Sequence, residues 1–274
     1  MSGSLTAVAP YRQVVVATDG SPFSANALVG GALLAQRTNA DLHLFHASSG
    51  SDVPVESQAA ALLDQPYKLE IRDLGGSSPA RMVAEYATEQ GDDSIVAVGT
   101  RGRGGVGGSI LGSTTVDLLA RTGHTTLAYG PEAANPLEIE RVVVCVDGSQ
   151  FSESSVPEGV RWATALNVPI WLIQVVPADL SPYIRMFESS YVRNLAKDLE
   201  GLRSEVQWDV LHSTSPARSI LDLFGNDAAT MLIMATHGRV GLERVLVGSI
   251  SLDVVKGAWG PVVLVRPLEL RPLS

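Results

Sequence analysis

Cysteine is nearly absent from this sequence of 274 residues, which contains only Cys145. A single thiol excludes an internal disulfide and a zinc site built from cysteines. Cys145 stands in an apolar run, residues 142–146, so we interpret it as a small hydrophobic residue of a buried strand. The histidines show no H-E-x-x-H or comparable spacing, and we therefore expect no dedicated metal site.

Basic residues and long apolar runs are scarce as well. Lys and Arg total 20 against 29 acidic residues, which gives a formal net charge of -9. A negative field repels nucleic acid phosphates and anionic lipids, so neither is an expected partner. No uncharged apolar run approaches the ~20 residues of a membrane helix, and no secretory signal pattern opens the chain. We therefore expect a cytoplasmic protein that binds neither nucleic acid nor membrane.

An internal repeat is present, which points to a duplicated unit. Residues 14–24 and 142–152 each run from Val-Val-Val through Asp-Gly-Ser to Phe-Ser. Three further pairs of blocks recur in the same order, at 42–47 and 170–175, at 78–81 and 215–218, and at 95–100 and 232–236. We expect a first domain over residues 1–131, a linker at 132–140 that contains Pro136 and three glutamates, and a second domain over 141–274.

Each lobe alternates strand-like and helix-like segments. The strand-like segments of the first lobe are continuous runs of Val, Ile and Leu near 14–17, 42–47, 68–73, 95–98 and 125–128. Such runs are typical of parallel strands that are covered on both faces. Helices are expected near 21–36, 56–64, 79–89, 113–121 and, in the second lobe, 188–203. The pattern predicts an α/β fold with two tandem doubly wound domains, each with a five-stranded parallel sheet.

A glycine-rich loop follows the fourth strand of the first lobe and ends at Gly112-Ser113, where a helix is expected. Ligands of doubly wound sheets bind beyond the carboxyl ends of the strands, and free N–H groups at a helix start bind phosphate. For the loop alone, a flexible turn capped by Ser113 is the alternative. A G-x-G-x-x-G pattern at 102–107 follows the wrong strand for a nicotinamide site, and no P-loop motif occurs.

The glycine pattern has a more specific interpretation. Gly99, Gly102 and Gly112-Ser113 form G-x2-G-x9-G-[ST], and Asp19 opens the motif D-G-S-x-x-S after the first strand. Together with the doubled architecture, these motifs resemble the universal stress protein family, and in particular its tandem two-domain members that bind ATP. The resemblance covers about residues 12–267. It implies that each lobe holds ATP, alone or with Mg²⁺, with the aspartate against the adenine.

The resemblance also assigns contact positions in each lobe. In the first lobe these are Ala17, Thr18, Asp19 and Ala47 at the adenine, Gly99, Arg101 and Gly102 at the ribose and phosphates, and Gly112, Ser113, Thr114 and Thr115 at phosphate oxygens. In the second lobe they are Val146, Asp147 and Val175, then Ala235, His237 and Gly238, then Gly248, Ser249, Ile250 and Ser251. Ala235 replaces the first motif glycine, a change that is tolerated only where φ is not positive.

No catalytic constellation emerges from the sequence. There is no G-x-S-x-G elbow, and one acid per lobe is little for two-metal chemistry. We therefore expect an ATP-holding stress-response or regulatory module rather than an enzyme, and assign no catalytic residue. The alternatives are a slow ATPase or nucleotide-activating transferase on a similar scaffold, and a structural dimerising module without nucleotide. The resemblance also implies a homodimer through the edges of the fifth strands, although lobe one has Thr125-Thr126 there, where lobe two has Pro261-Val262.

Overall fold

The computed structural model describes residues 10–22, 24–48, 55–100, 112–134, 138–178, 182–201, 204–236 and 248–266, without the side chains of 182–189. The first half contains β1 (Gln13–Ala17), α1 (Ala25–Thr38), β2 (Asp41–Ser48), α2 (Val55–Leu62), β3 (Lys68–Asp73), α3 (Pro79–Gln90), β4 (Ser94–Gly99), α4 (Ser113–Arg121) and β5 (Thr126–Tyr129). The second half contains β6 (Arg141–Val146), α5 (Gln150–Glu153), α6 (Val156–Leu166), β7 (Ile170–Val176), α7 (Pro182–Asp198), β8 (Val206–His212), α8 (Pro216–Phe224), β9 (Thr230–Ala235), α9 (Ser249–Gly257) and β10 (Val262–Val265).

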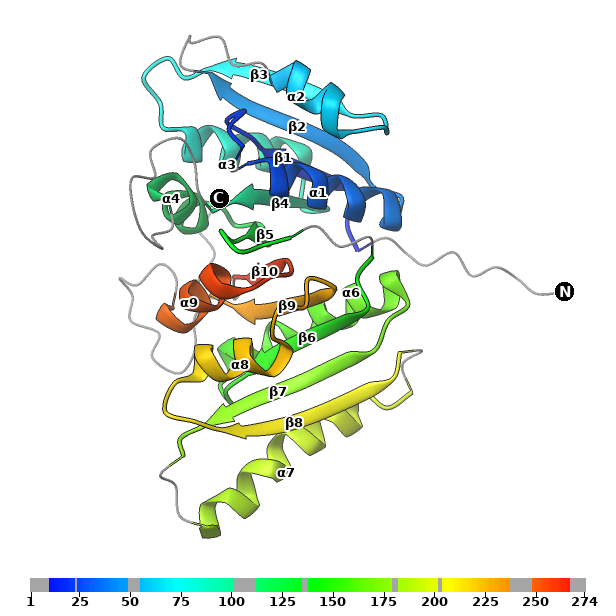
Figure 1. Ribbon diagram of the computed structural model, residues 1–274, viewed down its shortest axis with the longest axis vertical. Helices are drawn as coiled ribbons and strands as arrows, with labels where there is room; N and C mark the ends of the chain where they lie inside the picture. Colours follow the sequence, from blue (N-terminus) through cyan, green and yellow to red (C-terminus); the bar gives the residue numbers. More distant parts are fainter. Residues whose placement is uncertain are drawn as a thin grey trace, which may run out of the picture.

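The described strands form one 10-stranded sheet in the order β3-β2-β1-β4-β5-β10-β9-β6-β7-β8 (Figure 1). Neighbouring strands run parallel within each half. The strand order switches between β1 and β4 in the first half and between β6 and β9 in the second. This arrangement confirms the predicted fold class of two tandem doubly wound five-stranded α/β domains.

The two halves meet at a seam where β5 and β10 pair antiparallel. Thr126, Leu127 and Ala128 lie opposite Leu264, Val263 and Val262. The two edges that the sequence assigns to a homodimer are therefore paired with each other within one chain. A second copy could use these edges only by displacing the seam, so the described strands leave β3 and β8 as the outer edges of the sheet.

Helix α1, which follows β1, and helix α6, the second helix after β6, lie close to the sheet because each carries a glycine above a valine. An added Cβ at Gly31 would lie 2.7 Å from Cγ2 of Val16, and one at Gly159 would overlap Cγ2 of Val144. These glycines occupy corresponding positions of the repeat, so the duplication extends to packing contacts. Within the described ranges, no helix combines the length and the apolar character that a membrane span requires.

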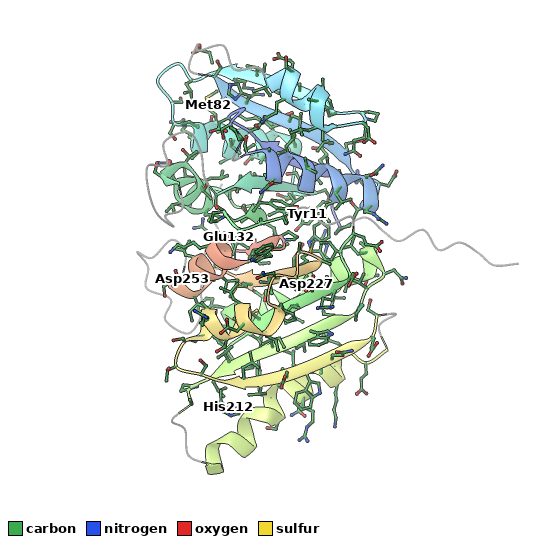
Figure 2. All side chains as sticks on the ribbon, in the orientation of Figure 1. Tyr11, Met82, Glu132, His212, Asp227 and Asp253 are labelled. Atoms are coloured by element: carbon green, nitrogen blue, oxygen red, sulfur yellow. The ribbon has the colours of Figure 1, made fainter. Side chains whose placement is uncertain are left out.

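The segment before β1 crosses from the first half to the second. The ring centroid of Tyr11 lies 6.0 Å from that of Trp162 on α6, and its hydroxyl donates a 2.8 Å hydrogen bond to Glu158. The Arg161 guanidinium lies over the Tyr11 ring, 4.8 Å from its centroid. Figure 2 shows Tyr11 close to the junction of the halves. This buried contact and the β5–β10 seam together join the lobes.

Candidate functional site

Those of the assigned positions that the structure describes gather at one edge of each half, where parallel strands end. Ala17 of β1 lies beside Phe45 of β2 and Val98 of β4. The segments that carry Asp19, Ala47 and Gly99 therefore leave the sheet side by side. In the second half, Val146 of β6 lies beside Gln174 of β7, and Cys145 lies beside Met234 of β9. Both edges flank a switch point, the usual ligand position in this architecture.

A tight turn after the first strand of each half orients an aspartate. The Oδ1 atom of Asp19 accepts a 3.0 Å hydrogen bond from the N–H of Ser21, and Gly20 between them has φ 70°. Asp147 accepts equivalent bonds from the N–H and hydroxyl of Ser149, at 3.0 and 2.6 Å, around Gly148 with φ 83°. Glycine is required in both turns because L side chains rarely adopt this conformation. The repeated Asp-Gly-Ser motif therefore fixes the direction of a carboxylate.

A buried polar residue at the end of the second strand was not assigned from the sequence. His46 is buried, and its Nδ1 lies 2.8 Å from the carbonyl oxygen of Thr18. The corresponding residue of the second half, Gln174, is also buried, and its Oε1 has no hydrogen-bond partner in the described part of the chain. The signal was present in the sequence, since both halves interrupt an apolar strand with a polar residue at this position.

The loop after the fourth strand of each half is closed at its base by one hydrogen bond. The N–H of Gly112 donates to the carbonyl of Thr100 at 2.8 Å, and that of Gly248 donates to Thr236 at 2.6 Å. The backbone of Gly112 and Gly248 is ordinary, with φ of -58° and -63°. At Gly248 an added Cβ would lie 3.3 Å from the Thr236 carbonyl oxygen. Close approach, rather than unusual torsion, therefore explains glycine there.

The first turns of α4 and α9 divide their polar groups between the sheet and solvent. The hydroxyl of Thr115 donates to the carbonyl of Gly99 at 3.3 Å, and that of Ser251 donates to Ala235 at 3.0 Å. These two buried hydroxyls tie the helices to the strand ends. The exposed positions are Ser113 and Thr114 on α4, and Ser249 and Ile250 on α9. The α4 turn thus presents one hydroxyl more to solvent than the α9 turn.

The alanine that replaces the first motif glycine is accommodated without strain. Among the described residues other than glycine, only Asn39 and Asn167 have positive φ. Ala235 ends β9 in extended backbone, as Gly99 ends β4, and neither position requires glycine for its torsion angles. The condition that the sequence set for Ala235 is met.

Thr100 was also missed by sequence reasoning. It follows β4 directly, is 1% exposed, and its Oγ1 has no hydrogen-bond partner in the described ranges. A buried hydroxyl without a partner is unfavourable, so this atom is suited to bind a polar ligand at the edge of the site. The repeat marks the position, since Thr236 follows β9 in the same way. Arg101, Gly102, His237 and Gly238 lie outside the described residues.

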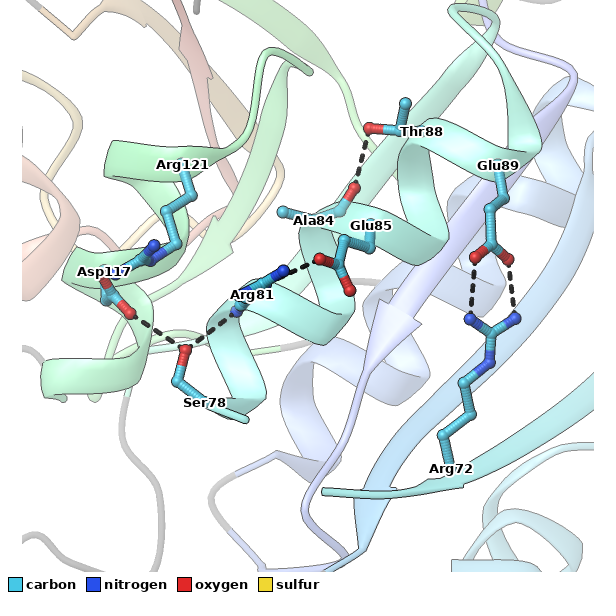
Figure 3. A network of polar contacts seen from close by, with 9 residues as sticks. All are labelled: Arg72, Ser78, Arg81, Ala84, Glu85, Thr88, Glu89, Asp117 and Arg121. Carbon is cyan, nitrogen blue, oxygen red and sulfur yellow. Dashed lines mark hydrogen bonds and ion pairs between the residues drawn. The ribbon is translucent and has the colours of Figure 1, made fainter. Parts of the chain in front are cut away.

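The outer side of α4 is held by α3. Ser78, the N-cap of α3, accepts a 3.2 Å hydrogen bond from the N–H of Arg81 and donates one to Asp117 of α4 at 3.4 Å (Figure 3). Asp117 also accepts from Nε of Arg121 at 2.7 Å. In the second half, Ser215 makes no side-chain cap, and Asp253 of α9 pairs with Lys256 of the same helix at 2.8 Å. The two helices are thus anchored differently.

The fold and the paired edges define a tandem protein of the doubly wound α/β class. The model of the Universal stress protein family matches residues 10–129 and again residues 138–266. The chain therefore belongs to the universal stress protein family and contains two of its domains.

Relatives of the same architecture cover nearly the whole chain. A universal stress protein of Mycobacterium tuberculosis is 25% identical over an alignment of 303 positions, gaps included, which covers 92% of this chain and 94% of the relative. The crystal structure of a universal stress protein from Archaeoglobus fulgidus has a TM-score of 0.67 at 15% identity and covers 93% of this chain and 98% of its own. A functionally unknown protein from Pseudomonas aeruginosa has a TM-score of 0.70 at 17% identity, over 95% and 94% of the two chains.

Proposed function

We propose that each lobe of this universal stress protein binds ATP, and that the protein acts as a regulatory module of the stress response. In this proposal the bound nucleotide alters the shape or the partners of the protein, and no catalytic residue takes part. The lobes are residues 1–131 and 141–274, joined by the linker at 132–140. One chain supplies both lobes, so the paired arrangement does not require a second copy.

The observation that carries the proposal is the supply of hydrogen-bond donors around the end of β4. Thr100 offers a buried hydroxyl that has no hydrogen-bond partner among the described residues, and Ser113 and Thr114 expose the first turn of α4. The N–H groups at a helix start lack intrahelical acceptors and bind phosphate oxygens. The oriented carboxylate of Asp19 can accept a hydrogen bond from the amino group of adenine. These groups fit the two ends of ATP.

Mg²⁺ fits the proposal as a companion of the phosphates rather than as a resident ion. This ion is bound by one or two carboxylates together with substrate phosphates, and each lobe offers one turn aspartate. Within the described ranges, no group of three His, Cys, Asp or Glu could hold a metal ion. Titrations with ATP in the presence of Mg²⁺ and of EDTA show whether ATP binds together with the ion or alone.

The basic test is the number of nucleotides per chain. The purified full chain is heat-denatured, released nucleotide is identified by chromatography, and the nucleotide-free protein is titrated with ATP in a calorimeter. We expect ATP to bind, more tightly in lobe one because Ile250 replaces Thr114 in lobe two. A protein that releases no adenine nucleotide and gives no heat with ATP contradicts the proposal.

A substitution at Thr100 gives a sharper prediction. Thr100→Val removes an unpaired buried hydroxyl at the site, so we expect it to stabilise the nucleotide-free fold and to weaken ATP about tenfold, or ~1.4 kcal/mol. The matched control is Thr126→Val, which removes another unpaired buried hydroxyl, on β5. The control should leave ATP affinity unchanged. Equal ATP affinity in both variants argues against Thr100 as a ligand.

The alternative of a slow ATPase or nucleotide-activating transferase is distinguished by turnover. Enzymes typically turn over at about 1–10³ per second, so steady-state phosphate release in this range would favour that alternative. ATP binding with no phosphate release above the buffer rate favours the regulatory module.

A further inference from the structure

Arg266 of lobe two contacts the last turn of α4 in lobe one. It directly follows β10, and its guanidinium donates to the carbonyl oxygens of Leu119, Ala120 and Thr122 at 3.4, 2.7 and 3.4 Å. Carbonyls at a helix end lack intrahelical donors, and a cation there also compensates the negative end of the helix dipole. Partial burial lowers the pKa of Arg266, but a guanidinium stays charged in proteins. Arg266 therefore caps a helix of the other lobe.

The corresponding contact in the opposite direction has no such cap. Gly130 follows β5 as Arg266 follows β10, and it faces the last turn of α9. An added Cβ at Gly130 would overlap the carbonyl oxygen of Val255, the residue that corresponds to Leu119. Glycine brings the two backbones together here but has no side chain to donate. Among the residues that the structure describes, the cross-lobe capping is thus one-sided.

The capped helix is the one whose first turn belongs to the proposed phosphate site. With 9 residues, α4 is about 14 Å long, so a contact at one end of this short, rigid helix affects the position of the other end. Its start is tied to β4 through Gly112 and Thr115, and its end is tied to lobe two through Arg266. Loss of the cap would leave carbonyls unsatisfied and loosen the helix that presents the donors.

We propose that Arg266 is a positioning residue for the nucleotide site of lobe one, so that the last strand of lobe two sets the affinity of the other lobe. The proposal rests on the proposed ATP binding. Phosphate at the start of α4 and guanidinium at its end favour the same orientation of the helix dipole. Because coupling is reciprocal, nucleotide in lobe one also strengthens the Arg266 contact.

The test uses the full chain with one lobe disabled at a time. Gly248→Val leaves lobe one as the binding lobe, and Gly112→Val leaves lobe two. Arg266→Met keeps most of the side-chain stem without its charge, and Arg266→Lys keeps the charge. In the Gly248→Val background we expect Arg266→Met to weaken ATP about tenfold, a typical coupling, and Arg266→Lys to restore part of the loss. In the Gly112→Val background we expect ATP affinity to remain within about twofold.

The control for loss of an arginine is Arg218→Met, on the exposed face of α8, where Arg218 pairs with Asp222. It should change neither affinity. Equal losses from Arg266→Met in both backgrounds, or no loss in either, would overturn the proposal.

Hydrogen exchange of the nucleotide-free protein separates this inference from the proposed function. Arg266→Met should speed exchange at least fivefold in peptides that cover 112–122 and leave 248–258 unchanged, a typical lower bound for coupling. If the unaltered protein binds no ATP but Arg266→Met still produces this local change in exchange, the proposed function is wrong and the cap stands as a structural contact. An equal change in exchange rate in both helices of the Arg266→Met variant contradicts the cap itself.

Discussion

The buried hydroxyls of Thr100 and Thr126 both lack a hydrogen-bond partner among the described residues, but they lie in different surroundings. Neither Oγ1 has a partner in the described part of the chain, but Thr100 lies at the proposed ligand site and Thr126 lies in the seam. An unsatisfied buried hydroxyl costs free energy whatever its position. Only at Thr100 could a ligand recover that cost, which makes this pair a direct comparison of function with packing.

Thr126→Val should raise the free energy of unfolding by about 1 kcal/mol, because the methyl group replaces a buried hydroxyl that has no hydrogen-bond partner within the described ranges. Urea unfolding followed by circular dichroism measures the change. As a control, Thr38→Val removes a hydroxyl that donates to the carbonyl of Leu34 at 2.7 Å, and it should not stabilise. A destabilised Thr126→Val protein would show that the hydroxyl is satisfied in solution.

His43 should make the fold less stable in mild acid. Burial and the nearby Lys68 charge lower the pKa of His43 from its ordinary value of 6.5, and its Nδ1 lies 3.2 Å from the hydroxyl of Tyr86. Below pH 6.5 the unfolded chain therefore binds more protons than the folded one, and stability falls as the pH drops. Above that value the contribution is constant.

We expect His43→Gln to flatten the dependence of unfolding free energy on pH below 6.5. Urea titrations at several pH values measure this slope. His212→Gln, which changes an exposed histidine, controls for the loss of a histidine as such. An unchanged slope in His43→Gln would assign the acid sensitivity to other groups.

At single positions the sequence predicts which side chains are present more readily than which way each one points. Asp19 and Asp147 were placed by the Asp-Gly-Ser turn, whose torsion angles only glycine adopts readily. Thr115 and Ser251 were expected at phosphate oxygens, but their hydroxyls bond to strand carbonyls. A motif shows that a hydroxyl is present in the first turn, whereas its direction depends on the strand beneath it.

At the scale of elements, the apolar runs predicted the strands closely and the helix starts less well. The first helix was expected from Ser21, yet α1 begins at Ala25. Ser21 and Ser24 each bond to the backbone of the other, and the Ser24 hydroxyl also bonds to that of Thr18, so this stretch forms a separate turn. In lobe two the same stretch forms the short helix α5 before α6. Local side-chain hydrogen bonds compete with helix formation here, and the periodicity of apolar residues does not reveal such bonds.

Gly130→Ala tests the close contact between the end of β5 and the last turn of α9. The added Cβ would overlap a backbone carbonyl that cannot rotate away, so we expect a loss of about 1–3 kcal/mol in unfolding free energy. Gly257→Ala is the matched control, because its Cβ would meet only the flexible side chain of Leu221, at 2.5 Å. Equal losses in the two variants would mean that the seam yields as easily as a side chain.

For the whole molecule, the apolar edges of β5 and β10 could not reveal their partner. Two equivalent edges can pair with each other in one chain or with copies in another, and the pattern of residues is the same in both cases. The linker length and the order of the lobes determine which of these pairings forms, and their effect can be seen only in the three-dimensional structure. The sequence therefore predicted the tandem domains, while the intrachain seam needed coordinates, and the ligand edge stays a prediction.

Tyr11→Phe should weaken the union of the lobes. The lost hydroxyl leaves the buried carboxylate of Glu158 without its 2.8 Å bond, and we expect a loss of about 1–3 kcal/mol. All four tryptophans lie in lobe two, and Trp162 beneath Tyr11 is fully buried, so fluorescence reports that lobe and circular dichroism reports both. In the unaltered protein the two transitions should coincide.

The control for Tyr11→Phe is Tyr191→Phe, which removes a tyrosine–glutamate bond of 3.0 Å inside lobe two. It should cost less because the contact is only partly buried. If Tyr11→Phe unfolds at the same urea concentration as the unaltered chain, the crossing segment does not hold the lobes together.

The one-sided cap at Arg266 has a consequence for how such a chain can evolve. When identical polypeptides associate, each mutation appears in both partners, and neither can specialise. A gene that encodes both partners in one reading frame removes this constraint. One domain can retain a polar side chain at its binding edge, while the other domain replaces it with an aliphatic one and supplies a supporting contact to its neighbour. Unequal duties within a fused pair are then open to selection.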